Sequence, residues 1–232
     1  MKPYQARTWF ALTAACVLVG VGMQVVLDWQ NYMPVLADTG EAVEKFGGSP
    51  AGRALNLFAF FTVQSNLIVG CTSLLLAITP NRSSTVFAVF RLIGLVAITI
   101  TGLVYHITLR GLVDLHGWEL VADHLQHTVV PLAAVVGWLV FGPRGLTSAR
   151  VVRLTILFPL AYLAFTLIRG PLASNWYPYP FTDVPTLGYL RVCLNTCAIL
   201  LFFIALAAGA TWLDKRLPGR QPVSQSVAAR NT

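Results

Sequence analysis

The chain has few charged residues. Among its 232 residues only 11% are Asp, Glu, Lys or Arg, while 56% are hydrophobic. Soluble domains carry about 25% charged residues, so this shortage excludes a soluble domain and indicates an integral membrane protein. The net charge of +7 does not indicate a nucleic acid partner, because the basic residues lie at the ends of apolar runs, where membrane topology places them.

Cysteine and internal repeats are also scarce. The four cysteines all lie inside apolar runs, and no Cys-x-x-Cys occurs. This excludes a disulfide framework and a cysteine zinc site, and predicts small buried hydrophobic residues. No internal repeat and no second domain are visible. Because transporters are commonly built from inverted repeats, this absence counts against a transporter.

Six apolar runs each approach or exceed the ~20 residues that a helix needs to cross a membrane. They predict an all-α polytopic membrane protein with one domain, 1–217, that forms a six-transmembrane-helix bundle. The helices are expected at about 8–29, 54–79, 86–109, 118–141, 151–169 and 187–213. Pro131 and Pro159 lie within spans and are expected to kink them. The polar residues 218–232 predict a disordered cytoplasmic tail.

Lysine and arginine are concentrated on the side of the predicted bundle that carries both termini. Because cytoplasmic loops of membrane proteins are rich in these residues, both termini are predicted to be cytoplasmic, in the plasma (inner) membrane. The last outer loop contains SNWYPYPF. Its aromatic side chains suit an interfacial belt or a lid over a cavity.

The fourth run opens with ADHLQHTVVP, which places Asp123, His124 and His127 in a segment expected to be in the membrane. An aspartate at the centre of a membrane helix costs about 2.5–3.5 kcal/mol, so these groups need partners or a function. Counting ~1.5 Å per residue puts His127 roughly 12 Å below the outer edge. Thr62 in the second run and Asn195 in the sixth count to a similar depth.

These matching depths predict a polar pocket that opens in the outer half of the membrane. The supporting polar candidates are Asp123, His124, Asn66, Arg191 and Asn195. The candidate pocket walls are Phe58, Phe61, Leu67, Tyr105, His106 and Trp176.

Structural roles are also open for several of these residues. A membrane threonine such as Thr62 can bond its own preceding carbonyl. Asn66 and Asn195 can join helices by hydrogen bonds, and Arg191 can extend to the outer interface. Asp123 can either orient His127 or pair with one of the outer arginines, Arg110, Arg169 or Arg191.

Three chemistries fit a deep histidine cluster. In acyl transfer, Thr62 is the nucleophile, His127 the base, and Asp123 or a backbone carbonyl orients the base. A metal site would use the Asp-His-x-x-His segment with His106, although an i,i+3 histidine pair converges poorly on a metal. Haem needs histidines on two facing helices, and the clearest pair shares one helix. We therefore expect no metal and no other cofactor.

Three segments together resemble the androgen-induced-protein family of six-span membrane proteins, which has many bacterial relatives. They are FFTVQSNLIVG in the second run, HLQHTVVPL in the fourth and WYPYPF in the last outer loop. The resemblance covers the second to sixth helices. Animal members are threonine hydrolases that cleave fatty acid esters of hydroxy fatty acids. The resemblance implies a nucleophilic Thr62 and a catalytic His127, with Asp123 standing where animal members are expected to have Asn.

These observations predict an intramembrane hydrolase of long-chain fatty acyl esters, with a membrane lipid or fatty acyl ester as its substrate. Asn195, Asn66 and Arg191 are the expected oxyanion donors. Two other functions stay open: a non-enzymatic lipid-binding protein or transporter, and a His/Asp metal-dependent membrane hydrolase. The sequence does not indicate an oligomeric partner.

Overall fold

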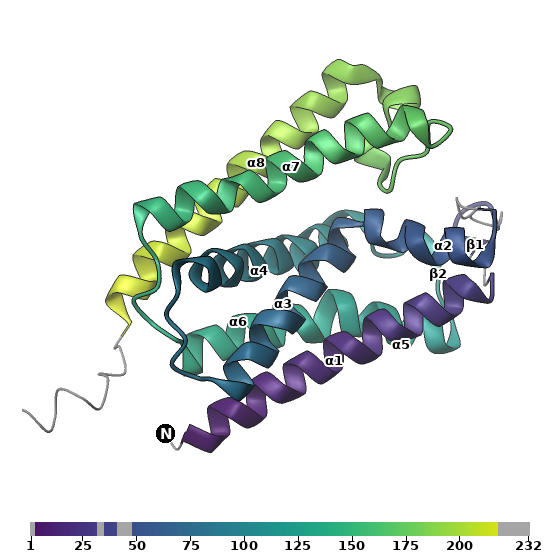
Figure 1. Cartoon of the computed structure of the whole chain (residues 1–232). Helices are drawn as coiled ribbons and strands as arrows, with labels where there is room; N and C mark the ends of the chain where they lie inside the picture. Colours follow the sequence, from purple (N-terminus) through teal and green to yellow (C-terminus); the bar gives the residue numbers. More distant parts are fainter. Residues whose placement is uncertain (1–2, 32–34, 41–47, 218–232) are drawn as a thin grey trace, which may run out of the picture.

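The computed structural model describes residues 3–31, 35–40 and 48–217, so the predicted tail 218–232 lies outside the described residues. The all-α prediction is confirmed, because the described chain contains six helices long and apolar enough to cross a membrane. These candidate spans are Tyr4–Trp29, Phe61–Ile78, Thr85–Leu109, Gly117–Phe141, Ala149–Leu172 and Val184–Arg216. Both ends of the described chain lie at the same end of the bundle (Figure 1).

The elements follow one another as a chain of helices with short interruptions. The first half contains α1 (Pro3–Trp29), β1 (Val35–Leu36), α2 (Pro50–Asn56), the 3₁₀ turn η1 (Leu57–Ala59), α3 (Phe61–Ile78), α4 (Thr85–Val104) and the π-helical turn η2 (Tyr105–Leu109). The second half contains β2 (Val113–Asp114), α5 (Gly117–His124), the π-helical turn η3 (Leu125–Val129), α6 (Val130–Phe141), α7 (Ala149–Leu172), the 3₁₀ turn η4 (Pro180–Thr182) and α8 (Val184–Arg216). The short strands β1 and β2 pair antiparallel.

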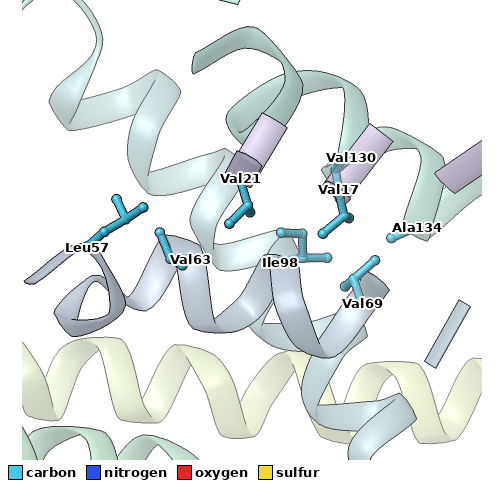
Figure 2. Packing of buried hydrophobic residues seen from close by; sticks show 8 residues of the cluster. All are labelled: Val17, Val21, Leu57, Val63, Val69, Ile98, Val130 and Ala134. Atoms are coloured by element: carbon cyan, nitrogen blue, oxygen red, sulfur yellow. The ribbon is translucent and has the colours of Figure 1, made fainter. Parts of the chain in front are cut away.

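Two large hydrophobic clusters hold the bundle together, with a smaller third one of Ala6, Phe10, Leu76 and Phe87. The first joins α1, η1, α3, α4 and α6, and its side chains point toward one another in Figure 2: Val17, Val21, Leu57, Val63, Val69, Ile98, Val130 and Ala134. The second joins α4 to α7 and α8: Ala88, Leu92, Val96, Ala97, Ile100, Val151, Phe203 and Ala207. In Figure 1, α7 and α8 lie together along one side of the other helices. Helix α4 is therefore the shared wall of both clusters.

The prediction of one continuous second helix over 54–79 is wrong, because the structure interrupts it at Phe60. Phe60 has φ −79° and ψ 131°, which is extended backbone between η1 and α3. Two tyrosines from distant segments satisfy backbone groups on either side of the break. The Tyr162 hydroxyl donates to the Ala59 carbonyl (3.0 Å), and the Thr62 N–H donates to the Tyr179 hydroxyl (3.1 Å).

The fourth span also departs from a regular α-helix, near the predicted kink at Pro131. Proline lacks an N–H, so Pro131 cannot bond the His127 carbonyl as a regular helix would. The turn before it, Leu125–Val129, widens into the π-helical turn η3, in which Val130 N–H bonds the Leu125 carbonyl. Gly102 of α4 packs against this turn, since an added Cβ there would lie 3.4 Å from the His127 carbonyl oxygen and 3.1 Å from Pro131 Cβ.

Close packing between α1 and α3 yields a stability prediction. A Cβ added at Gly70 would lie 2.9 Å from Val17 Cγ1, whereas one added at Gly209 of α8 would meet nothing within 4 Å. Gly70→Ala should therefore lower the free energy of unfolding by about 1–3 kcal/mol through overpacking. Gly209→Ala should leave it unchanged or raise it by up to about 1 kcal/mol. Unfolding of both variants in detergent tests this, and equal stability of the two would contradict it.

Candidate active site

Thr62 and His127 face each other across two helices, as the sequence predicts. Thr62 Oγ1 lies 3.3 Å from His127 Nε2. Thr62 belongs to the first turn of α3, directly after the break at Phe60, and His127 is the middle residue of the π-helical turn η3. The hydroxyl is buried, with Thr62 9% exposed. A buried hydroxyl and a partly buried imidazole are thus in contact.

Asp123 binds the other side of the imidazole. Its Oδ1 lies 2.8 Å from His127 Nδ1, and its Oδ2 accepts a hydrogen bond from the Tyr105 hydroxyl (2.6 Å). The Tyr105 ring also stacks on the His127 ring, with centroids 4.1 Å apart and an interplanar angle of 12°. Both carboxylate oxygens are therefore engaged within the site. Of the two roles left open for Asp123, orientation of His127 is the one that this geometry supports.

The hydrogen bonds around His127 have only one consistent direction. A carboxylate accepts and does not donate, so the proton of a neutral His127 lies on Nδ1. Nε2 then carries a lone pair and accepts the hydrogen bond from the Thr62 hydroxyl. This tautomer follows from the partners of the ring. It is the arrangement in which a histidine can remove a proton from a hydroxyl.

Asn66 joins the two turns that carry the site. Its Nδ2 donates to the carbonyls of Thr62 (2.9 Å) and Gln126 (3.2 Å). Gln126 in turn reaches the carbonyl of Gly20 in α1 (3.4 Å). Asn66 is therefore a positioning residue that links the start of α3 to η3. The structure places its amide N–H groups on backbone carbonyls and not beside the Thr62 hydroxyl.

An apolar pocket opens beside Thr62, between the start of α3, α4, α7, α8 and the α7–α8 loop. The empty space within it is about 790 Å³, part of which is open to the outside. Thr62 and Tyr179 are among its polar lining residues, whereas most of the wall is apolar, including Ile100, Val104, Leu160, Leu163, Ile199 and Leu200. A hydroxyl at one side of an apolar space suits a ligand with one polar group and an alkyl chain.

Several predicted pocket residues lie elsewhere, although Phe61 does line the pocket. Phe58 is exposed, and Leu67 packs against the first hydrophobic cluster. The Trp176 ring packs on the Phe60 ring, with centroids 5.6 Å apart. These three residues lie apart from this pocket because it lies on the α7–α8 side of α3, whereas sequence depth alone favoured the space between the second and fourth spans.

The remaining predicted polar residues do not converge on Thr62. His124 is exposed, with Nδ1 2.7 Å from the Leu120 carbonyl oxygen, and His106 contacts the Thr128 hydroxyl (3.1 Å). Asn195 donates to the Phe181 carbonyl (3.1 Å), and Arg191 is exposed. Within residues 3–31, 35–40 and 48–217, no group of three or more His, Cys, Asp or Glu side chains is placed to hold a metal ion.

Two site residues, Tyr179 and Tyr162, are missed by the sequence analysis. Both line the pocket, and both bond the backbone at the Phe60 break. Tyr179 belongs to the aromatic stretch WYPYPF, whose position predicts a lid or belt but not which ring points inward.

Comparison of the chain with protein family models, curated proteins and solved structures finds no match.

The geometry predicts one tautomer of His127. In histidine-labelled protein in nanodiscs, neutral His127 should show a protonated Nδ1 and an unprotonated Nε2, because Asp123 accepts from Nδ1. Nitrogen-15 NMR distinguishes these states, and the difference spectrum against His127→Gln assigns the signal. A neutral ring with its proton on Nε2 would contradict the proposed direction of the hydrogen bonds.

Proposed function

We propose that this protein is an intramembrane hydrolase of long-chain fatty acyl esters that uses Thr62 as nucleophile and His127 as base. The observation that carries the proposal is the contact series Thr62 Oγ1 to His127 Nε2 (3.3 Å) and His127 Nδ1 to Asp123 Oδ1 (2.8 Å), beside an apolar pocket. A nucleophile, a base and an orienting group in that order define the general arrangement for acyl transfer.

The reaction proceeds in two halves. First, Thr62 Oγ1 attacks the ester carbonyl carbon while its proton passes to His127 Nε2, and the carbonyl electron pair moves onto the carbonyl oxygen. The intermediate collapses by breaking the bond to the alkoxy oxygen, which takes the proton from His127. Water then attacks the acyl-threonine with His127 again as base, which releases the fatty acid and restores Thr62.

Asp123 and Tyr105 support the histidine through both halves. The carboxylate stabilises the imidazolium that forms when His127 takes the threonine proton. The Tyr105 hydroxyl satisfies the second carboxylate oxygen, and Asp123 is only 8% exposed. A buried carboxylate needs such partners, because an unpaired one is costly in a low-dielectric interior.

The pocket supports a lipid substrate over a water-soluble ester. Its wall is mostly apolar, so an acyl chain gains burial there in proportion to its length. Phosphoester hydrolysis would call for a metal ion or several basic groups near the nucleophile, and among the described residues no Lys or Arg belongs to the pocket wall. A fatty acid ester of a hydroxy fatty acid, the substrate class implied by the family resemblance, fits these requirements.

The bundle's location is part of the same proposal. Six apolar helices are compatible with a multi-pass membrane protein. The Lys and Arg distribution favours cytoplasmic termini in the plasma (inner) membrane. With that orientation, the site lies in the outer half of the bilayer, where a lipid can reach the pocket from the side.

The hydrolase proposal predicts that Thr62→Ala and His127→Ala each abolish turnover while the protein stays folded. Activity of purified protein in nanodiscs should be measured with p-nitrophenyl esters of increasing chain length and with a branched fatty acid ester. The wild type should prefer long chains. His124→Ala is the matched control, since this exposed histidine contacts the Leu120 carbonyl and not Thr62, and it should retain activity. No hydrolysis by the wild type, or undiminished hydrolysis in both alanine variants, would favour the lipid-binding alternative.

Asp123→Asn tests the orienting role separately. The amide can donate to Nδ1 where the carboxylate accepts, so the variant favours the wrong tautomer and cannot stabilise the imidazolium. We expect turnover to fall by about two to four orders of magnitude, as for the corresponding change in serine hydrolases. Steady-state kinetics on the preferred ester measures this. Wild-type turnover in Asp123→Asn would assign the carboxylate to structure alone.

A further inference from the structure

The Tyr179 hydroxyl touches the proposed nucleophile at two atoms. Its oxygen lies 3.1 Å from the Thr62 backbone nitrogen and 3.2 Å from Thr62 Oγ1. Tyr179 comes from the loop between α7 and α8, far from Thr62 in sequence, and is 9% exposed. The α7–α8 loop therefore contacts both the backbone N–H and the side-chain hydroxyl of Thr62, the proposed nucleophile.

This position is the one that an ester carbonyl oxygen must occupy during attack. In acyl transfer, the oxyanion lies about 2.7–3.1 Å from its hydrogen-bond donors, and the carbonyl group approaches the nucleophile to about 3–3.5 Å. The Tyr179 oxygen, 3.1 Å from the Thr62 nitrogen, meets the first condition, and an ester whose carbonyl oxygen takes this place has its carbonyl carbon beside Thr62 Oγ1. The Thr62 N–H is in the first turn of α3, where amides have no partner within the helix and the helix dipole favours negative charge.

The Tyr179 proton points toward the reacting atoms. The Tyr179 oxygen accepts from the Thr62 N–H, while the Thr62 hydroxyl proton is committed to His127 Nε2. The contact between the two hydroxyls is then completed by Tyr179 donating to Thr62 Oγ1. Burial raises the pKa of Tyr179 above its ordinary value, which keeps the phenol protonated at neutral pH.

The surrounding loop holds the Tyr179 ring in place. The ring stacks on Phe181, with centroids 5.1 Å apart, and meets the Phe60 ring edge-on at 5.7 Å. The Thr182 hydroxyl donates to the Tyr179 carbonyl (2.9 Å), and Asn195 donates to the Phe181 carbonyl (3.1 Å). These contacts keep the Tyr179 hydroxyl beside the start of α3.

We infer that the Tyr179 hydroxyl and the Thr62 N–H form the oxyanion hole of this site, with Tyr179 a catalytic residue. The inference rests on the proposed ester hydrolysis. When Thr62 Oγ1 attacks, the carbonyl oxygen takes the hydrogen bond of the Thr62 N–H. The Tyr179 hydroxyl moves back by about one hydrogen-bond length and donates to the new oxyanion. The tyrosine keeps its proton throughout, and no bond to it forms or breaks.

This assignment replaces the oxyanion donors expected from the sequence. Asn66 donates its amide hydrogens to two backbone carbonyls. Asn195 donates to the Phe181 carbonyl in the loop that carries Tyr179, and Arg191 is exposed. Asn195 thus acts through Tyr179 as a positioning residue.

Tyr179→Phe removes the hydroxyl and keeps the ring that packs on Phe60 and Phe181. We expect kcat for the preferred p-nitrophenyl ester to fall about 10²–10³-fold, the usual effect of losing one oxyanion donor, with little change in KM. Tyr177→Phe is the matched control. Tyr177 is on the same loop, and its hydroxyl has no hydrogen-bond partner within the described part of the chain, so this variant should keep wild-type kinetics.

A second measurement distinguishes loss of the Tyr179 hydroxyl from a change in the folding of the variant. A long-chain alkyl trifluoromethyl ketone forms a tetrahedral adduct with an active hydroxyl and mimics the intermediate. For Tyr179→Phe its inhibition constant should rise by about the same factor as kcat/KM falls, while thermal unfolding in nanodiscs stays near that of Tyr177→Phe.

Each contrary result has a definite meaning. If Thr62→Ala abolishes hydrolysis but Tyr179→Phe stays within about threefold of wild type, the oxyanion role is wrong and the hydrolase proposal stands. Increased activity in Tyr179→Phe would show that the hydroxyl blocks the site, which also overturns the inference. If Thr62→Ala retains hydrolysis, the proposed function itself fails.

Discussion

In a membrane-spanning bundle every backbone N–H and C=O needs a partner within the protein. The break at Phe60 leaves such groups without helical partners directly beside Thr62. A helix that stops and restarts leaves backbone groups without intrahelical partners. Here the hydroxyls of Tyr162 and Tyr179 supply partners on the two sides of the break. The same contacts attach α7 and the α7–α8 loop to the start of α3. Without the break, Thr62 would lie inside a continuous helix, with its N–H already bonded.

The break at Phe60 and the π-helical turn η3 are irregular turns on facing helices, and they carry Thr62 and His127. The break leaves the Thr62 amide without an intrahelical partner, so that it donates to the Tyr179 hydroxyl, and η3 brings His127 opposite Thr62. Asn66 ties these two irregular turns together through their carbonyls. Irregular turns often coincide with functional sites because they aim side chains that a regular helix would direct elsewhere. In this bundle the hydrophobic clusters fix the helices, and these two turns position Thr62 and His127.

Much of the architecture could be predicted from the sequence, because the length of an apolar run reports directly on a membrane-spanning helix. Depth counting also brought Thr62 and His127 together, since both positions are measured from helix ends. The break at Phe60 could not be predicted in this way. No proline or glycine marks it, and the groups that stabilise it come from residues more than 100 positions away along the chain, such as Tyr162 and Tyr179.

The same limit explains why three of the predicted pocket residues lie apart from the pocket beside Thr62. Phe58, Leu67 and Trp176 were placed by depth and hydrophobicity, which do not determine the face of a helix that borders a cavity. The role of Asp123 also needed a three-dimensional contact, because an i,i+4 spacing allows contact with His127 but does not exclude an arginine partner. Its bond to Tyr105, from another helix, completes the assignment.

The central claim is that His127 and Asp123 activate the Thr62 hydroxyl as a nucleophile. The most direct measurement is covalent labelling of the purified protein in nanodiscs with a long-chain alkyl fluorophosphonate, followed by mass spectrometric mapping of the modified residue. The account predicts one stoichiometric adduct on Thr62 that is lost in His127→Ala. Absence of labelling, or an adduct on another residue with Thr62 unmodified, would contradict it.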